Sequence, residues 1–276
     1  MNIPDQDSHK SRLSYPFLLL CLVTGMVFIL WLMNTPPGLL GKTDAIGYAV
    51  CHRIGERSYH LGERPLSLCA RCSGMFLASL VGLIYQAVIG QRRAGWPSKR
   101  ILAVLAVLIL SFAFDGVNSY VQYIRGIGLL YQTNNILRAA TGTGMGVVLA
   151  VVLYPTFGQT VWREYDPKSA IANWRQFGSM IGLSGLVVLL LLSGNPLILY
   201  PLTLLSAAGV LIMMTLLYSM IYITVAKKEN QAESWRDLLT PMIIGFLLAL
   251  LQICLLDFGR YALTGSWDGF PANLGR

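Results

Sequence analysis

The chain has 276 residues, of which 55% are hydrophobic and only 12% are charged, and its mean hydropathy is +0.58. A soluble domain carries roughly 25% charged residues, so this composition excludes a soluble globular protein and indicates an integral membrane protein. The formal net charge is +8. Because the basic residues lie between apolar runs and accompany no nucleic-acid motif, we expect membrane topology to explain them and expect no nucleic-acid partner.

Seven apolar stretches approach the roughly 20 residues that a membrane-spanning helix needs. They cover residues 16–33, 73–90, 101–121, 136–155, 178–193, 198–225 and 238–258. The fifth stretch is short and only the turn SGNP separates it from the sixth, so counts of six and eight spans stay open. The sequence therefore predicts an all-α, polytopic helical membrane bundle of about seven transmembrane helices in the lipid bilayer, forming a single domain over residues 1–276.

The first stretch is expected to stay in the protein as a membrane anchor. Basic residues precede it, as in a signal peptide, but no small-residue cleavage site follows. The segment MNTPPGLLG that comes next is expected to be a loop, because of its paired prolines and its glycines.

Lysines and arginines between the spans predict the orientation. Twelve of the 21 fall in the N-terminal segment and in the connections on the same side, and nine fall on the other side. Four of those nine lie close together in one motif, and a fifth lies in a predicted helix. When these five are left out, twelve basic residues lie on the N-terminal side and four on the other side. We therefore expect a cytoplasmic N-terminus.

That motif, CHRIGERSYHLGERPLSLCARC at residues 51–72, holds three of the five cysteines and two of the three histidines. Thiolate and imidazole are ligands that zinc prefers, and structural sites often pair cysteines two residues apart. Cys69 and Cys72 form such a pair, and Cys51 with one of the two histidines completes a Cys₃His set. Adjacent residues such as Cys51 and His52 share an ion only where the backbone bends, so the fourth ligand stays open.

Two other interpretations of the motif remain open. Arginines flank the thiols, and nearby positive charge favours the thiolate that metal binding and redox chemistry both require. Cys69 and Cys72 could therefore cycle between dithiol and disulfide, with Cys51 as the exchange partner. The third interpretation is a structural disulfide or packed thiols, with the arginines in contact with lipid phosphate. Cys21 and Cys254 lie inside apolar runs and are assigned no chemistry.

Polar residues of other spans fall on the same side of the membrane, because successive spans alternate in direction. FDGVNSY supplies Asp115 and Asn118, and TNNILRAATGTGMG supplies Asn134, Arg138 and Thr141. The spacing places each set on one helix face. A charge at mid-membrane costs at least about 2.5 kcal/mol, so we expect Asp115 and Arg138 to pair. The glycines of TGTGMG are expected to allow close helix packing.

The elements CHRIGERS, LCARCSGMFL, FDGVNS and LRAATGTGMG together resemble a family of multi-pass prokaryotic membrane proteins, domain of unknown function 2085. The resemblance covers roughly residues 45–150 and leaves residues 156–276 as additional transmembrane helices. It implies an integral protein of the prokaryotic plasma membrane with a shared polar motif, and no established activity. Family members carry Pro where this chain has Gly55 and an apolar aromatic residue where it has His60, which favours His52 as the fourth ligand.

Four functions are compatible with these features. The first is an enzyme at the extracytoplasmic face, with zinc as its cofactor and a lipid-linked or amphipathic anionic substrate. The others are a small-molecule transporter or channel, a thiol-disulfide redox protein and a scaffold. Spans three and four carry only apolar or small residues toward the expected cytoplasmic side, which argues against a transport path. No nucleotide-binding motif occurs in the connections, so no nucleotide is expected. The candidate residues are Cys51, His52, Cys69 and Cys72 for the metal, Asp115, Asn118 and Arg138 for catalysis, and Arg53, Arg57, Arg71, Asn134 and Thr141 for the substrate.

Overall fold

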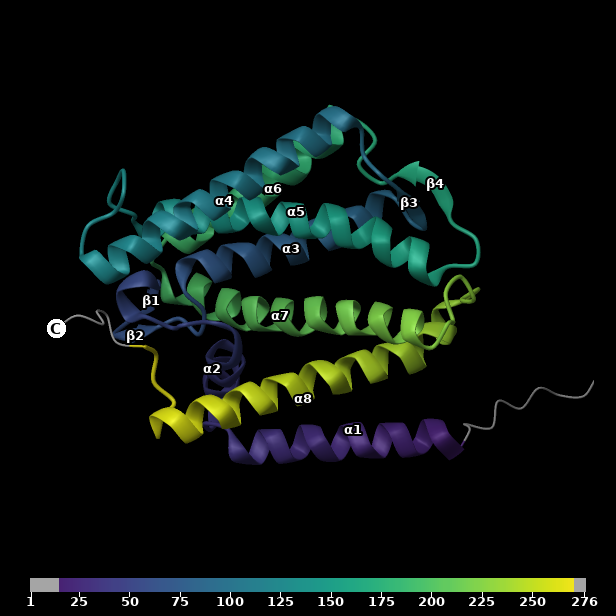
Figure 1. Ribbon diagram of the computed structural model, residues 1–276, viewed down its shortest axis with the longest axis horizontal. Helices are drawn as coiled ribbons and strands as arrows, with labels where there is room; N and C mark the ends of the chain where they lie inside the picture. Colours follow the sequence, from purple (N-terminus) through teal and green to yellow (C-terminus); the bar gives the residue numbers. More distant parts are fainter. Residues whose placement is uncertain (1–14, 271–276) are drawn as a thin grey trace, which may run out of the picture.

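Long helices run side by side along the longest dimension of the molecule (Figure 1). The computed structural model describes residues 15–270. Its helices are α1 (Tyr15–Asn34), α2 (Gly38–Val50), α3 (Ala70–Ile89), α4 (Lys99–Arg125), α5 (Asn135–Val161), α6 (Trp174–Leu192), α7 (Pro196–Val225) and α8 (Leu239–Thr264). Within the described part, seven helices, all but α2, are long and apolar enough to cross a membrane. The predicted helical membrane bundle is confirmed.

Short strands and 3₁₀ turns occur only in the connections of the described chain. Strands β1 (His60–Leu61) and β2 (Arg64–Pro65) form an antiparallel hairpin, and β3 (Arg93–Gly95) and β4 (Asp166–Ser169) pair in parallel. The 3₁₀ turns are η1 (Gly55–Arg57) and η2 (Trp235–Leu238).

The segment after the first span differs from the prediction. Two prolines, Pro36 and Pro37, interrupt the chain after α1, but helix α2 begins immediately at Gly38, so the predicted loop is wrong from that residue onward. With 13 residues, α2 is about 20 Å long and too short to cross the roughly 30 Å hydrocarbon core of a bilayer. It lies crosswise to the long helices (Figure 1).

The bundle has two distinct ends (Figure 1). The β1–β2 hairpin, the α4–α5 connection and the last turn of α8 lie at one end, which we call the motif end. The β3–β4 pair, the α7–α8 connection and the first turn of α1 lie at the opposite end. The cysteine loop, the end of α4, the start of α5 and the end of α8 therefore share one side, as the alternation of the spans predicts.

Helices α3 and α5 approach each other closely through small residues. Gly142 and Gly146 of α5 lie against the backbone carbonyls of Arg71 and Met75 on α3, and Gly74 of α3 lies against the α5 backbone. A Cβ atom at any of these glycines would overlap the facing backbone. Such small-residue contacts are common between membrane helices, and the predicted packing role of the TGTGMG segment is confirmed. The contact brings the CARC turn beside the first turns of α5.

Candidate functional site

Three cysteine sulfurs meet at the motif end. Cys51 directly follows α2, Cys69 is the N-cap of α3, and Cys72 lies in the first turn of α3. Their Sγ atoms all lie within 4.8 Å of one another, and all three residues are free cysteines. Cys51 is 7% exposed and Cys69 is 2% exposed. Cys72 is half-buried. Two segments 18 residues apart therefore build one largely buried group of sulfurs, which we call the Cys₃ cluster.

The local backbone explains how the sulfurs meet. Cys51 and Cys69 both have extended backbone (ψ 150° and 162°), so each lies outside helical geometry where a helix ends or begins. The backbone N–H of Cys69 donates to Cys51 Sγ at 3.4 Å, and the N-terminus of α3 adds partial positive charge that favours a thiolate. Hydrogen bonds from the Cys69 and Cys72 thiols hold the pKa of Cys51 well below its usual value. The contact with Cys51 raises the pKa of Cys69.

His52 is not brought into the Cys₃ cluster. The ring nitrogens of His52 are not part of the group of mutually close ligand atoms found in residues 15–270. Its Nδ1 accepts a hydrogen bond from the backbone N–H of Ile54 at 3.0 Å, so a neutral ring carries its proton on Nε2. Metal-binding histidines usually donate their second ring N–H instead. The fourth ligand expected from the sequence is thus not in place.

Asp115 contacts the cysteine motif through Arg71, the arginine of the CARC turn. Arg71 forms an ion pair with the Asp115 carboxylate and donates to the Asp115 carbonyl at 3.2 Å. The hydroxyls of Tyr131 and Thr141 also donate to this carboxylate, at 2.8 and 3.2 Å. Asp115 is 1% exposed. The predicted Asp115–Arg138 pair is wrong, because the close α3–α5 contact brings Arg71 to the carboxylate instead.

Arg138 is buried among neutral acceptors. Its guanidinium donates to Ser119 Oγ at 3.1 Å, to Asn135 Oδ1 at 3.0 Å and to Thr133 Oγ1 at 2.6 Å. No carboxylate of the described chain lies within ion-pair distance of it, and the residue is 6% exposed. Arg138 is therefore a buried cation that hydrogen bonds hold in place and that forms no ion pair with residues 15–270.

Arg57 adds a third positive charge to this region. It donates to the Ser119 carbonyl at 3.1 Å, and its guanidinium lies 4.9 Å from the centre of the Tyr123 ring. Burial, together with the nearby charge of Arg71, lowers the pKa of Arg57. Of these three arginines, only Arg71 forms an ion pair within the described chain, with Asp115. This excess of positive charge attracts anions, and we call Arg57, Arg71 and Arg138 the arginine cluster.

The remaining predicted residues contact the backbone or another loop. The Asn118 side chain holds the α4–α5 connection: its Nδ2 donates to the Tyr131 carbonyl at 2.9 Å and its Oδ1 accepts from the Leu130 N–H at 3.1 Å. Asn134 caps α5 by accepting from the Leu137 N–H at 2.9 Å. Asn118 and Asn134 therefore hold loop and helix ends.

Arg53 pairs with Asp44, a carboxylate that is not among the predicted site residues. Arg53 forms an ion pair with Asp44 at 2.9 Å and donates to the Trp267 carbonyl at 2.8 Å. Asp44 also pairs with Arg64 and accepts from Ser67 Oγ at 2.7 Å. The sequence could have indicated Asp44, because it is the only carboxylate in the short, mostly apolar segment that forms α2.

Arg260 of α8 holds the backbone of the cysteine loop from outside. It donates to the carbonyls of Tyr48 and Cys51 at 2.7 and 2.8 Å. Its guanidinium lies between the Tyr48 and Phe270 rings, 4.0 and 4.3 Å from their centres. The end of α8 and the segment after it therefore fix the position of Cys51.

Comparison with known proteins finds a family that matches the part of the chain around the site. Residues 51–152 match the family described as Predicted membrane protein (DUF2085). The resemblance stated from the sequence motifs is confirmed. This DUF2085 segment contains the Cys₃ cluster, the arginine cluster and Asp115, whereas α1, α2, α6, α7 and α8 lie outside it.

Two archaeal relatives are similar to part of the chain. A protein described as uncharacterized from Methanothermobacter thermautotrophicus is 28% identical over 103 residues, which cover 37% of this chain and 83% of the relative. Uncharacterized protein MJ1492 from Methanocaldococcus jannaschii is 24% identical over 162 residues, which cover 54% of this chain and 97% of the relative. No solved structure matches.

Proposed function

We propose that the protein binds a zinc ion through Cys51, Cys69 and Cys72 at the extracytoplasmic face of the membrane. The observation that carries this proposal is the mutual distance of the three sulfurs, at most 4.8 Å. Tetrahedral zinc with Zn–S bonds of about 2.3 Å separates its sulfurs by roughly 3.8 Å, so small side-chain rotations suffice. Two of the sulfurs also lie at the N-terminus of α3, which favours the thiolates that the metal requires.

The neighbouring arginine cluster suggests what the metal site acts on. Three sulfur ligands leave one tetrahedral position for water or a substrate oxygen, as in catalytic zinc sites. We propose that the anionic group of a lipid-linked or amphipathic substrate binds Arg57, Arg71 and Arg138. Asp115 is the candidate acid or base, and it also positions Arg71. Four further residues support this site: Arg53 connects the cysteine loop to α2, Asn118 holds the α4–α5 connection, Asn134 caps α5, and Thr141 donates to Asp115.

Thiol redox exchange is the second candidate, because three free thiols lie close enough to exchange partners. Transport is less favoured. Away from the motif end, α4 and α5 pack through an apolar cluster that includes Leu105, Val148 and Val151, which leaves no polar path along the two helices that carry Asp115 and Arg138.

Metal analysis of the purified full-length protein tests the proposal. We expect about one zinc ion per chain in the unaltered protein, and a loss of at least tenfold in zinc affinity for Cys51→Ser and Cys69→Ser. The matched controls are Cys21→Ser and Cys254→Ser, since these cysteines lie in the spans and their sulfurs are not part of the Cys₃ cluster, and they should keep the metal. Absence of stoichiometric metal, together with a reversible disulfide detected by thiol trapping, would replace the zinc proposal with the redox one.

A second arm of the same experiment tests the anion. Dodecyl phosphate is the probe, and Arg138→Gln is compared with Arg93→Gln at the opposite end of the bundle. We expect Arg138→Gln to weaken binding at least tenfold, while Arg93→Gln leaves it unchanged. Equal binding by both variants would remove the arginine cluster from the proposed site.

A further inference from the structure

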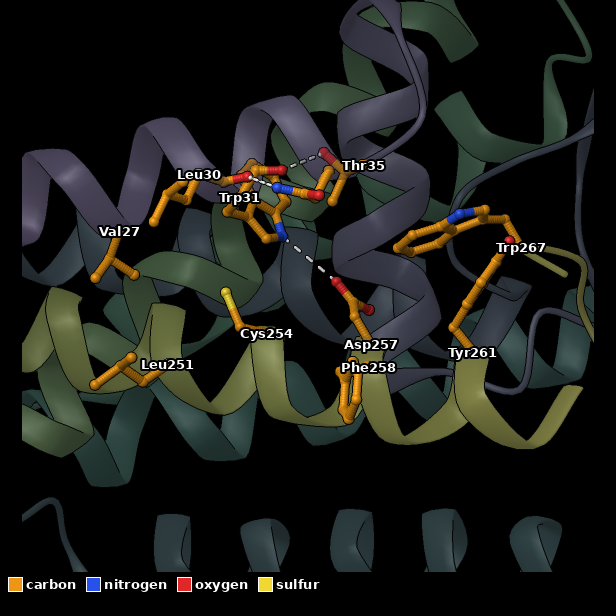
Figure 2. A pocket seen from close by; sticks show the side chains of 11 residues that line it. Val27, Leu30, Trp31, Thr35, Leu251, Cys254, Asp257, Phe258, Tyr261 and Trp267 are labelled. Carbon is orange, nitrogen blue, oxygen red and sulfur yellow. Dashed lines mark hydrogen bonds between the residues drawn. The ribbon is translucent and has the colours of Figure 1, made fainter. Parts of the chain in front are cut away.

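A cavity of about 520 Å³ opens between α1 and α8 (Figure 2). No cysteine of the Cys₃ cluster lines it. Its volume falls within the range of small-molecule sites. Apolar side chains of both helices, Val27, Leu30 and Leu251, line one end (Figure 2). Trp267 and the carboxyl group of Asp257 line the other end (Figure 2). The cavity is therefore polar at one end and apolar at the other.

The carboxyl group of Asp257 lacks a full set of partners. Asp257 is 4% exposed. Its Oδ2 accepts from Trp31 Nε1 at 3.4 Å, and its Oδ1 has no hydrogen-bond partner in the described chain. The nearest arginine along the helix, Arg260, donates instead to backbone carbonyls. Asp257 forms no ion pair within residues 15–270. A buried carboxylate without an ion-pair partner is costly, so a ligand that brings a positive charge would be stabilised here.

Aromatic rings surround the same end of the cavity. Trp31, Phe258, Tyr261 and Trp267 all line it, and Trp267 is held by Tyr48 and Tyr261, with ring centres 5.0 and 5.5 Å away. Aromatic faces attract cations, and ammonium groups are their usual ligands. Four aromatic side chains and one carboxylate thus form a wall suited to an ammonium group.

The depth of the cavity suits an amphiphile. Asp257 lies seven residues before the end of α8 at Thr264, which is about 10 Å along the helix. The ammonium end therefore lies toward the motif end of the bundle. Val27 and Leu251 lie farther toward the middle of α1 and α8 (Figure 2), where a hydrocarbon chain would meet apolar surface.

We propose that this cavity binds an amine that carries a hydrocarbon chain. Asp257 is the counter-ion of the ammonium group, and the hydrocarbon chain lies along Val27 and Leu251. The amine has two sources with the same chemistry, the ethanolamine headgroup of a bilayer lipid or a free long-chain amine. This proposal is independent of the zinc proposal, because no residue that lines the cavity belongs to the Cys₃ cluster.

Tryptophan fluorescence offers a direct test. Trp31 and Trp267 line the cavity, while the other four tryptophans, Trp96, Trp162, Trp174 and Trp235, belong to segments at the opposite end. The full-length protein in lipid nanodiscs is titrated with a brominated dodecylammonium, which quenches nearby indoles. We expect saturable quenching and at least tenfold weaker binding of the amine by Asp257→Asn. Binding of brominated dodecanol should be the same in the unaltered protein and in Asp257→Asn. Val27→Phe, which fills the apolar end and keeps the carboxylate, should also weaken binding, and thermal unfolding checks that both variants fold.

Two nanodisc compositions distinguish the sources of the amine. Both contain the same fraction of phosphatidylglycerol, and the second lipid is either a galactolipid without an amine or phosphatidylethanolamine. Weaker apparent binding of the probe in phosphatidylethanolamine identifies the lipid headgroup as the occupant, and equal binding identifies a free amine. The proposal is overturned if the amine binds Asp257→Asn as tightly as the unaltered protein, if the alcohol binds as tightly as the amine, or if quenching never saturates.

Discussion

Two buried aspartates at the motif end differ in what surrounds their carboxyl groups. Asp115 accepts hydrogen bonds from Arg71, Tyr131 and Thr141, so both of its oxygens are occupied. Asp257 accepts only from Trp31 within the described chain. The first carboxylate is therefore built into the protein, where it holds the CARC turn against α4, and the second faces a cavity.

The Asp115–Arg71 pair gives a stability prediction. Asp115→Asn removes the negative charge and keeps the shape, so it leaves Arg71 uncompensated beside two other arginines. Breaking a buried pair costs roughly 3–5 kcal/mol. Because Arg71 is 17% exposed, we expect a loss of about 3 kcal/mol in the free energy of unfolding, measured by chemical denaturation in detergent.

The matched control for that variant is Asp166→Asn. Asp166 pairs with Arg93 at 3.5 Å, and both side chains are about one-third exposed. An exposed pair contributes about 1 kcal/mol or less. If the two variants lose the same free energy, the Asp115 pair has no special role in holding the site together.

The sequence predicted which polar residues meet, but not which of them pair. Alternation of the spans was enough to bring Asp115 to the side of the cysteine motif. Its partner depends on the register between α3 and α5, which Gly142 sets by contact with the Arg71 backbone. Spacing along one helix carries no information about that register, so the sequence predicts Arg138 as the partner of Asp115 where the structure has Arg71. The position of His52 outside the Cys₃ cluster is also not predictable from spacing. It depends on the local conformation of the loop, in which the Ile54 N–H donates to His52 Nδ1.

At the scale of the elements, the family-matched segment depends on helices outside it. Cys51 ends α2, and Arg260 of α8 holds the Cys51 carbonyl. Hydropathy could not reveal α2, because its 13 residues are too few for a span and the paired prolines before it are typical of a loop. The long helices were predictable because each is a continuous apolar run bounded by polar residues.

Close packing of α3 and α5 predicts a linked loss of stability and metal binding. In Gly142→Ala, the new Cβ meets the Arg71 carbonyl and pushes the two helices apart. Overpacking costs typically about 1–3 kcal/mol, and we expect that loss in the free energy of unfolding. Zinc affinity should fall as well, because Arg71 lies between Cys69 and Cys72.

Gly182→Ala on α6 is the control for this packing variant. A Cβ at Gly182 meets no atom within 4 Å, and alanine is favoured over glycine in a helix by up to about 1 kcal/mol. The control should therefore be neutral or stabilising, with unchanged zinc affinity. A Gly142→Ala protein that unfolds and binds zinc like Gly182→Ala would show that the α3–α5 contact does not set the site.

At the scale of the whole molecule, the two ends differ in chemistry. The motif end carries the Cys₃ cluster, the arginine cluster and the amine cavity, while the opposite end carries the short β3–β4 pair and the basic connections (Figure 1). Lysines and arginines outside the motif concentrate at that opposite end. Basic connections usually stay in the cytoplasm, so the motif end should face outward, where thiols and zinc meet an oxidising compartment.

Cysteine labelling in intact cells checks this orientation. Glu63→Cys places an exposed thiol in the β1–β2 hairpin at the motif end, and Gln231→Cys places one in the exposed α7–α8 connection at the other end. We expect a membrane-impermeant maleimide to label the first variant in intact cells and the second only after permeabilisation. The unaltered protein measures the background of its own cysteines. Five candidate spans, α3 to α7, separate the two labelled positions, so these positions should lie on opposite sides of the membrane. The reverse labelling pattern would place the zinc site in the cytoplasm, where a reducing environment favours metal binding over disulfide exchange.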